Sequence, residues 1–468
     1  MSMPTRTFLT IVEEKRKTKG IDDLKEDVRK LIYEKKELED QLQLVDHLQQ
    51  LGVAYHFKDD IDDVLRCIYG SLEDINKLLK VDLHATALVF RLLRENGFDV
   101  SEDLFNRFRD EKGDFKASLQ HETKGILSLY EASYVEKEGE LVLDRAMDFT
   151  TMHLKCFVEK GSLDPRLREH VAHALELPLH WRMQRSHTRW WFIEAYQREA
   201  TMNPVVLELA KLNFNVVQGM YKGELRELSR WWTNLGLAQK LSFFRDSLTE
   251  NFLWTVGCAI EPQFWEYREI QTKANCFIAM LDDVYDIYGT LNELELFTEA
   301  IERWEANAID KLPDYMKLCF LAIFNAANET GYRVMKEKGL DIIPCLRHGR
   351  IYAKRSCWKQ NGTTKATSQS LTSTWTTRGC RLPCYMLESG VPEMAARKKI
   401  RELIKANRRG INGDRGSSFG EIFKTVAVGL PRMSQFIYQH GDGYSAPDGK
   451  TKKQIMSLLF EPLQLSKL

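Results

Sequence analysis

Apolar residues recur at helical spacing along most of this chain, and this pattern constrains the fold more than any other feature. Between residues 24 and 51 they fall three or four positions apart among charged residues. These apolar residues are Leu24, Val28, Leu31, Ile32, Leu42, Leu44, Val45 and Leu48. Similar stripes follow at residues 61–79, 86–96, 145–158 and 205–228. Because strand-like alternation is hard to find, the sequence predicts amphipathic helices from residue 21 to about residue 340.

A polar break at residues 200–204 separates two blocks of helices. Pro204 suits the first turn of a new helix, where its missing N–H would have no partner. We therefore expect an all-α fold with a disordered segment at 1–20 and two helical domains, at 21–200 and 201–468. The second domain should be a bundle around a cavity. No fixed-period repeat is present, which disfavours a helical solenoid.

Charge and cysteine content exclude several classes of protein. The 67 Lys and Arg residues balance the 67 Asp and Glu residues, so we expect no nucleic-acid partner. No apolar run approaches the roughly 18 residues of a membrane-spanning helix. Nine cysteines without a CxxC pair predict reduced thiols. Glu13 and Glu14 argue against a transit peptide, so the sequence as written predicts a cytoplasmic location.

Three carboxylates follow one apolar segment. Asp282, Asp283 and Asp286 come directly after residues 277–281, which are all apolar. On an α-helix Asp282 and Asp286 share a face, and Asp283 lies beside them. Carboxylate oxygens on one surface suit Mg²⁺, which also takes phosphate oxygens as ligands. The pattern predicts a Mg²⁺ site at the end of a buried helix, and a solvated acidic face is the alternative.

Longer motifs accompany these carboxylates, at residues 51–57, 175–183, 231–237, 282–298 and 438–443. As a set they resemble the plant class I terpene synthases, and the angiosperm monoterpene synthases in particular. The resemblance covers residues 21–347 and 384–468. It implies an α-barrel-like N-terminal domain and a class I terpenoid synthase bundle in the C-terminal domain. It also implies a monomer or weak dimer, and a plastid location for monoterpene synthase relatives.

The resemblance implies a carbon–oxygen lyase that depends on Mg²⁺, for which Mn²⁺ can substitute. Such enzymes ionise a prenyl diphosphate to a carbocation, with the metals acting as Lewis acids, and then form a cyclic or acyclic terpene. Monoterpene-like motifs favour geranyl diphosphate as substrate, and farnesyl diphosphate is the alternative. The pocket must exclude water, because water would quench the cation.

Further residues take roles from the same resemblance. Arg245 matches the first arginine of the family's RxR motif, which holds the departing diphosphate, while Ser247 replaces the second arginine. Trp254 matches an aromatic side chain that faces the carbocation, which its π-face can stabilise. The residues that resemble those near the family's pocket lid are Tyr438, Asp442 and Tyr444.

Two family motifs are missing. The tandem-arginine motif of monoterpene synthases is not found, so the N-terminus reads as truncated. The second metal motif, (N/D)DxxSxxxE, should lie between residues 341 and 384. From residue 342 to residue 385 there is no Asp or Glu. The sequence therefore predicts an impaired or inactive synthase. One alternative function is that of a catalytically dead helical pseudoenzyme. If the set of motifs occurs by chance, the alternative is a helical scaffold unrelated to terpene synthases.

The codons of the aberrant segment can be read in another frame. Read one base earlier, the codons of residues 357–362 allow Leu-Glu-Ala-Lys-Trp, which the family has at this point. The junction of Trp375 and Thr376 forces an Asp within an allowed Glu-Tyr-Met-Asp-Asn, another family string. We infer that residues 347–383 are an aberrant segment, largely translated out of frame. A deletion or skipped exon then removes the second metal motif.

Genomic sequence across codons 341–388 tests this inference. We expect that a one-base shift restores the family reading within this segment. We also expect that coding sequence for the missing motif is deleted or skipped before codon 384. An uninterrupted reading frame that encodes these same residues, with no lost exon beside it, would contradict the inference.

Overall fold

Helices make up the regular structure of this protein. The computed structural model describes residues 8–346 and 389–465, apart from residues 36, 80–81, 162, 242 and 445–448, together with residues 382, 385 and 386. Within these ranges no strand forms, and a single isolated bridge joins Arg109 and Phe115. The predicted all-α fold is confirmed. The segment predicted to be aberrant, at residues 347–383, lies outside the described residues except for residue 382.

The chain divides into two compact units. Unit one comprises Met1–Gly219 and Ser389–Leu468, and unit two comprises Met220–Glu388. The division falls within α11 (Pro204–Leu235), which begins at Pro204, as the preference of proline for the first helical turn predicts. The domain boundary proposed near residue 200 stays a prediction.

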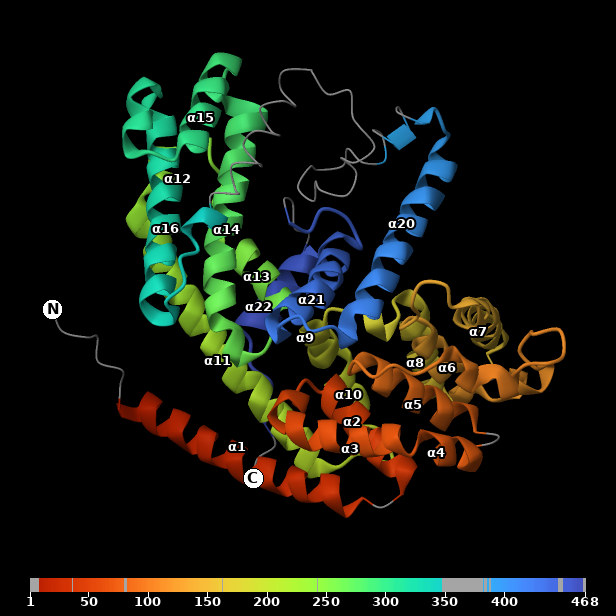
Figure 1. Ribbon diagram of the computed structural model, residues 1–468. Helices are drawn as coiled ribbons and strands as arrows, with labels where there is room; N and C mark the ends of the chain where they lie inside the picture. Colours follow the sequence, from red (N-terminus) through yellow and green to blue (C-terminus); the bar gives the residue numbers. More distant parts are fainter. Residues whose placement is uncertain are drawn as a thin grey trace. The chain divides into compact units, whose positions relative to one another are not determined.

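Unit one is built from helices that pack largely in chain order, with α5 against α6 and α6 against α7 (Figure 1). Its helices besides α11 are α1 (Phe8–Glu34), α2 (Leu38–Gln50), α3 (Lys58–Gly70), α4 (Leu72–Leu78), α5 (Leu83–Glu95), α6 (Thr123–Ser133), α7 (Leu141–Lys160), α8 (Pro165–Glu176), α9 (Gln184–His187), α10 (Ile193–Tyr196), α20 (Glu393–Gly413), α21 (Glu421–Tyr438) and α22 (Gly449–Leu459). Short 3₁₀ turns occur between several of them.

The apolar stripe of residues 24–51 forms the buried face of α1 and α2. Val28 and Ile32 are buried on α1, and the buried residues of α2 are Leu42, Leu44, Val45 and Leu48. Helix α1 begins at Phe8, so residues 8–20, which we expected to be disordered, are helical. No proline interrupts the sequence of α1, so nothing there breaks the helix toward its N-terminus.

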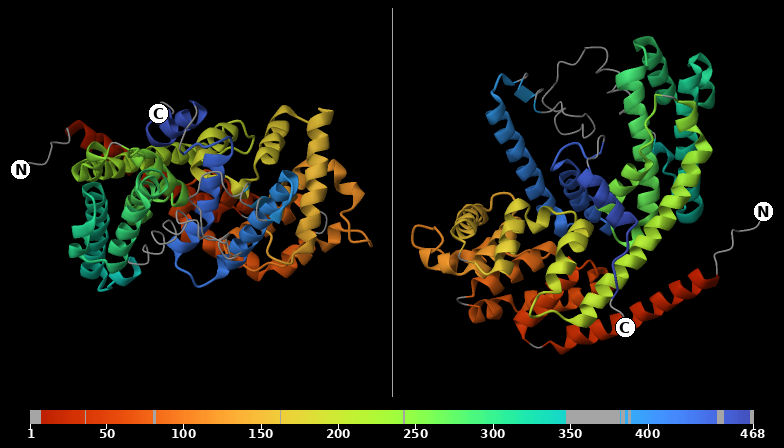
Figure 2. Two further views of the ribbon diagram at one scale, coloured as in Figure 1. Left: turned by 90° about the horizontal axis from the view of Figure 1, so that it is seen from above. Right: turned by 180° about the vertical axis from the view of Figure 1, so that it is seen from behind.

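Unit two is a bundle of helices, coloured from light green to turquoise in Figure 2. Helix α13 packs along α14, and α16 contacts α12, α14 and α15. Its helices besides α11 are α12 (Leu237–Lys240), α13 (Leu248–Cys258), α14 (Trp265–Asp283), α15 (Leu291–Arg303), α16 (Asp314–Lys338) and α17 (Ile343–Leu346). Its core is rich in large side chains, among them the buried Phe252, Phe277, Met280, Phe297 and Phe320.

One fully buried arginine anchors α14 to α11. The Arg268 Nε and Nη2 atoms donate to the two carboxylate oxygens of Glu224 at 2.8 and 2.6 Å. Its Nη1 atom donates to the carbonyls of Ala259 and Glu261 at 2.8 and 2.7 Å. Its guanidinium also lies 5.0 Å from the ring centroid of Tyr221. Because a buried charge is costly without such partners, these bonds hold α14 in one register.

Replacing Arg268 should therefore destabilise unit two. Arg268→Met leaves the largely buried Glu224 carboxylate unpaired, and we expect the free energy of unfolding to fall by about 3–5 kcal/mol. Urea unfolding followed by circular dichroism measures this loss. The matched control is Arg333→Met, which breaks the more exposed pair with Glu269 and should cost about 0–1 kcal/mol. Equal losses in the two variants would contradict an anchoring role for Arg268.

Candidate functional site

The three aspartates predicted to bind Mg²⁺ lie where an α-helix changes into a π-helical turn. Helix α14 ends at Asp283, and the π-turn η7 spans Val284–Tyr288. Asp282 and Asp283 are half-buried, while Asp286 is exposed. The predicted helix end is confirmed, but Asp286 does not continue the same α-helix. Single π-turns inside helices are frequent at functional sites.

The π-turn is held by a close backbone approach and by one buried tyrosine. The Gly289 N–H donates to the Val284 carbonyl at 2.8 Å. A Cβ atom on Gly289 would lie 2.7 Å from Leu294 Cδ2 and 3.0 Å from the Val284 oxygen, so a side chain there would have to displace the buried Leu294. The Tyr285 hydroxyl lies 2.8 Å from Thr298 Oγ1, whose own proton goes to the Leu294 carbonyl at 2.7 Å. Tyr285 is therefore the donor, and it ties the turn to α15.

A carboxylate next to the turn caps α15. Glu293 accepts hydrogen bonds from the Thr290 N–H and hydroxyl at 3.0 and 2.8 Å, and from the Tyr315 hydroxyl at 3.2 Å. The bonds from Thr290 lower the pKa of Glu293, which favours its charged form. The sequence motifs assign Glu293 no role, although a threonine followed three residues later by a glutamate is a signature of helix capping.

The arginine segment lies in the loop between α12 and α13. Arg245 is exposed, and Ser247 is buried. The Ser247 hydroxyl accepts a hydrogen bond from Asn251 Nδ2 at 3.2 Å. Where the resemblance led us to expect the second arginine of the RxR motif, the chain thus has a short, buried hydroxyl that is already hydrogen-bonded.

Trp254 is half-buried on α13. This helix is fixed against α14 by a 3.0 Å hydrogen bond between the fully buried hydroxyls of Thr255 and Thr272. Asn251 also contacts Cys276 Sγ on α14 at 3.5 Å, and burial raises the pKa of that thiol to about 12, so the thiol stays neutral. These polar contacts set the register between the helix that carries Trp254 and the helix that ends in the aspartates.

Tyr438 and the residues near it belong to unit one. Tyr438 ends α21 and is 51% exposed. The Asp442 carboxylate accepts from the Tyr444 N–H at 3.2 Å, and the Gly443 N–H donates to the Ile437 carbonyl at 3.1 Å. Unit two thus contains the predicted arginine, tryptophan and aspartates, whereas the predicted lid residues lie in unit one.

The donor set of the aspartate segment suits a metal shared with a substrate. In the part of the chain that is described, no three His, Cys, Asp or Glu side chains could together hold a metal ion. Asp282, Asp283 and Asp286 therefore do not form a ready three-ligand cage. Mg²⁺ commonly binds proteins through one or two carboxylates and completes its shell with water and substrate phosphates. The carboxylates of this segment fit that mode of binding.

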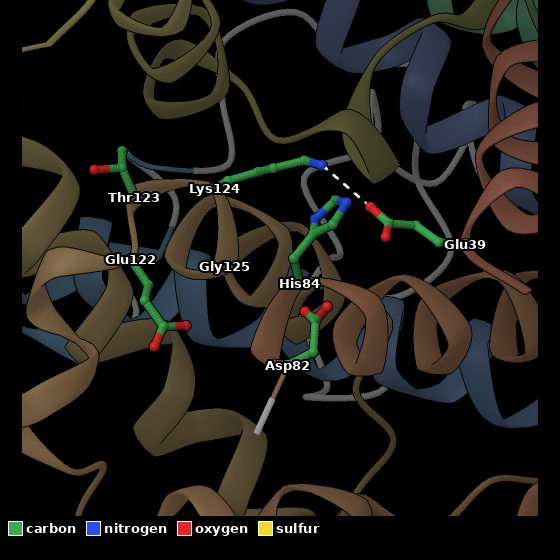
Figure 3. A pocket seen from close by; sticks show the side chains of 7 residues that line it. All are labelled: Glu39, Asp82, His84, Glu122, Thr123, Lys124 and Gly125. Atoms are coloured by element: carbon green, nitrogen blue, oxygen red, sulfur yellow. Dashed lines mark ion pairs between the residues drawn. The ribbon is translucent and has the colours of Figure 1, made fainter. Parts of the chain in front are cut away.

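A pocket of about 330 Å³ lies in unit one, at the N-terminal ends of α5 and α6 (Figure 3). It is lined by Glu39, Asp82, His84, Glu122, Thr123, Lys124 and Gly125. Asp82 caps α5 by accepting from the Ala85 N–H at 2.9 Å, and Lys124 pairs with Glu39 at 3.6 Å. None of the predicted site residues lines this pocket, and we assign it no ligand.

Two protein-family models match segments of this chain. Residues 2–175 match the terpene synthase N-terminal domain, and residues 233–383 match the metal-binding domain of the terpene synthase family. The second match contains Arg245, Trp254 and the three aspartates. None of the helices described is long and apolar enough to cross a membrane.

Individual relatives cover nearly the whole chain. Monoterpene synthase 8, chloroplastic, from Hedychium coronarium is 50% identical over 522 residues, covering 97% of this chain and 88% of the relative. Isoprene synthase from grey poplar leaves (Populus x canescens), in complex with three Mg²⁺ ions and dimethylallyl-S-thiolodiphosphate, has a TM-score of 0.88 at 37% identity, covering 96% and 97% of the two chains. Limonene synthase with 2-fluorolinalyl diphosphate has a TM-score of 0.89 at 34% identity, covering 99% of each.

The close approach at Gly289 yields a prediction about the π-turn. Gly289→Ala should lower the free energy of unfolding by about 1–3 kcal/mol, because the new methyl group overlaps Leu294 and the Val284 carbonyl. Gly223→Ala is the matched control. A Cβ atom at Gly223, within α11, meets nothing within 4 Å and should raise stability by about 0.5–1 kcal/mol. Urea unfolding measures the free energy of unfolding of both variants, which should fall for Gly289→Ala and rise for Gly223→Ala. A Gly289→Ala variant that is more stable than the unaltered chain would refute the overlap.

Proposed function

Because the chain belongs to the terpene synthase family, we propose that its substrate is geranyl diphosphate and that Asp282, Asp283 and Asp286 hold Mg²⁺ against the diphosphate. The observation that carries this proposal is the break from α14 into the π-turn, which sets three carboxylates in one short segment of the matched metal-binding domain. Similarity to a monoterpene synthase supports geranyl diphosphate, and farnesyl diphosphate is the alternative.

In the ionisation step, different residues of the chain position the metal, bind the diphosphate and stabilise the cation. The carbon–oxygen bond breaks, and its electron pair leaves with the diphosphate. Bound Mg²⁺ supplies Lewis-acid chemistry, which neutralises the charge of the leaving group. In this proposal the carboxylates of Asp282, Asp283 and Asp286 position the metal. Arg245 donates N–H groups to diphosphate oxygens, and the ring of Trp254 stabilises the allylic cation without attacking it.

Tyr438 is proposed to act near the pocket lid, as in the family. A relative bound to three Mg²⁺ ions and a thiolodiphosphate supports the assignment of a metal–diphosphate site to this fold. The chloroplastic relative supports a plastid location.

We further propose that this chain turns over prenyl diphosphates poorly or not at all. Residues 342–385 contain no Asp or Glu, so carboxylates of the second metal motif are missing there. The alignment to the Hedychium coronarium relative runs over 522 positions, although this chain has 468 residues, so the relative carries residues that this chain lacks. The buried Ser247 supports the same proposal, because it removes a second arginine from diphosphate capture.

Calorimetric titration with Mg²⁺ and inorganic diphosphate tests the aspartate site. We expect binding to the chain as written, and Asp283→Asn should weaken it by about tenfold or more, because one ligand to the metal becomes neutral. Glu299→Gln is the control, since this glutamate is exposed on α15 and has no proposed role in metal binding. Unchanged affinity in Asp283→Asn would count against the site.

One pair of activity assays tests both the proposed impairment and the choice of substrate. The chain as written and a version with the frame and lost segment restored are assayed with geranyl and farnesyl diphosphate. We expect the restored version to be faster by at least about 10²–10³-fold, the usual effect of losing one preorganised electrostatic contact, and to prefer geranyl diphosphate. Equal terpene output from the two would refute the impairment. Preference for farnesyl diphosphate would support the alternative substrate, and inactivity of both would support a pseudoenzyme.

A further inference from the structure

Three aromatic rings meet beside the candidate site in unit two. The rings of Phe243 and Tyr288 are stacked, with centroids 3.9 Å apart and an interplanar angle of 19°. Tyr315, on α16, stands edge-on to both rings, at 5.9 Å from Phe243 and 5.4 Å from Tyr288. Stacked and edge-to-face pairs are the favourable arrangements of aromatic side chains. We call these three residues the aromatic triad.

The triad joins the two segments that are proposed to hold the diphosphate. Phe243 lies two residues before Arg245, and Tyr288 lies two residues after Asp286. Arg245 belongs to a loop without regular structure, and Asp286 belongs to a π-turn. Arg245 is not carried by a helix, and Asp286 lies beyond the end of α14, so side-chain contacts help to set the distance between these two residues.

The two neighbouring phenylalanines of the loop have different partners. The Phe244 ring is buried and packs against Trp232 on α11, with ring centroids 5.5 Å apart. This contact ties the loop to the core of unit two. The Phe243 ring instead meets Tyr288, which is 50% exposed. Because half of Tyr288 remains in solvent, burial alone does not explain why this ring lies flat on Phe243.

The third ring is held in place by the cap of α15. The Tyr315 hydroxyl donates to Glu293 at 3.2 Å, and the same carboxylate accepts from Thr290 at the start of α15. Burial raises the pKa of Tyr315, so its hydroxyl stays protonated and can donate. Tyr315 thus braces the stacked pair from α16, and the triad connects the arginine loop, the π-turn and two helices.

We propose that the aromatic triad is a positioning element that holds Arg245 at a set distance from the aspartate segment. Arg245 and the metal held by the aspartates can then engage the same diphosphate. This inference rests on the proposed diphosphate site. A preorganised arginine loses less conformational freedom on binding, so the triad should contribute to diphosphate affinity without touching the ligand.

The first test measures affinity of the full chain for inorganic diphosphate in the presence of Mg²⁺. Phe243→Leu should raise the Kd by about two- to tenfold, the range expected for one aromatic pair. Tyr288→Leu should match it, whereas Phe243→Tyr keeps a ring and should bind like the unaltered chain. Phe324→Leu is the control, because Phe324 stacks on Phe320 in the same unit at 5.6 Å and 19°. Its Kd should not change, and a rise equal to that of Phe243→Leu would overturn the proposal.

The second test is a double-mutant cycle with Arg245. If the triad acts through this arginine, Phe243→Leu should have no further effect on the Kd in the Arg245→Ala background. Fully additive effects would overturn the positioning role. Weaker binding in Arg245→Ala together with an unchanged Kd in Phe243→Leu would overturn it as well, while leaving the diphosphate site intact. If neither Arg245→Ala nor Asp283→Asn alters the Kd, the proposed site itself fails, and the positioning role fails with it.

Discussion

The buried ion pair between Arg268 and Glu224 is the interaction on which the geometry of unit two most depends. Arg268 has no exposed surface, and its N–H groups donate to the two oxygens of one carboxylate and to nearby carbonyls. Low polarity around the pair strengthens the attraction, but it also makes any unpaired member costly. Helix α14 can therefore take only the register that keeps this pair intact. Asp282 and Asp283 lie at the other end of the same helix, so their position along the bundle axis follows from this register.

At the end of α14 the structure must keep like charges close together. Asp282 and Asp283 are adjacent, and Asp286 follows after one π-helical turn. Mutual repulsion would favour separating these groups. The turn resists that separation because Tyr285 points into the core and hydrogen-bonds to Thr298 on α15, while Gly289 permits the backbone to close on Val284. A cation with phosphate oxygens among its ligands is the natural partner for carboxylates held in this way.

Much of this could be predicted from residue spacing. The helices and the start of α11 at Pro204 follow from local rules of periodicity and proline geometry. The capping of α15 by Glu293 was readable as well, since it depends on residues only three positions apart. The extension of α1 to Phe8 was not foreseen, because an apolar stripe identifies a buried face and does not mark where an exposed helix begins.

By itself the sequence determined the helical class of the protein, its family and the residue types available for binding a metal and a diphosphate. It also determined that residues 342–385 offer no carboxylate. Only the tertiary structure decided that the aspartate segment passes from an α-helix into a π-turn, that Ser247 is buried, and that Phe243 meets Tyr288. The physical reason is the distance along the chain over which each kind of interaction acts. Periodicity and capping act over a few residues, whereas ring stacking and buried hydrogen bonds join residues far apart in the chain, whose proximity no local rule supplies.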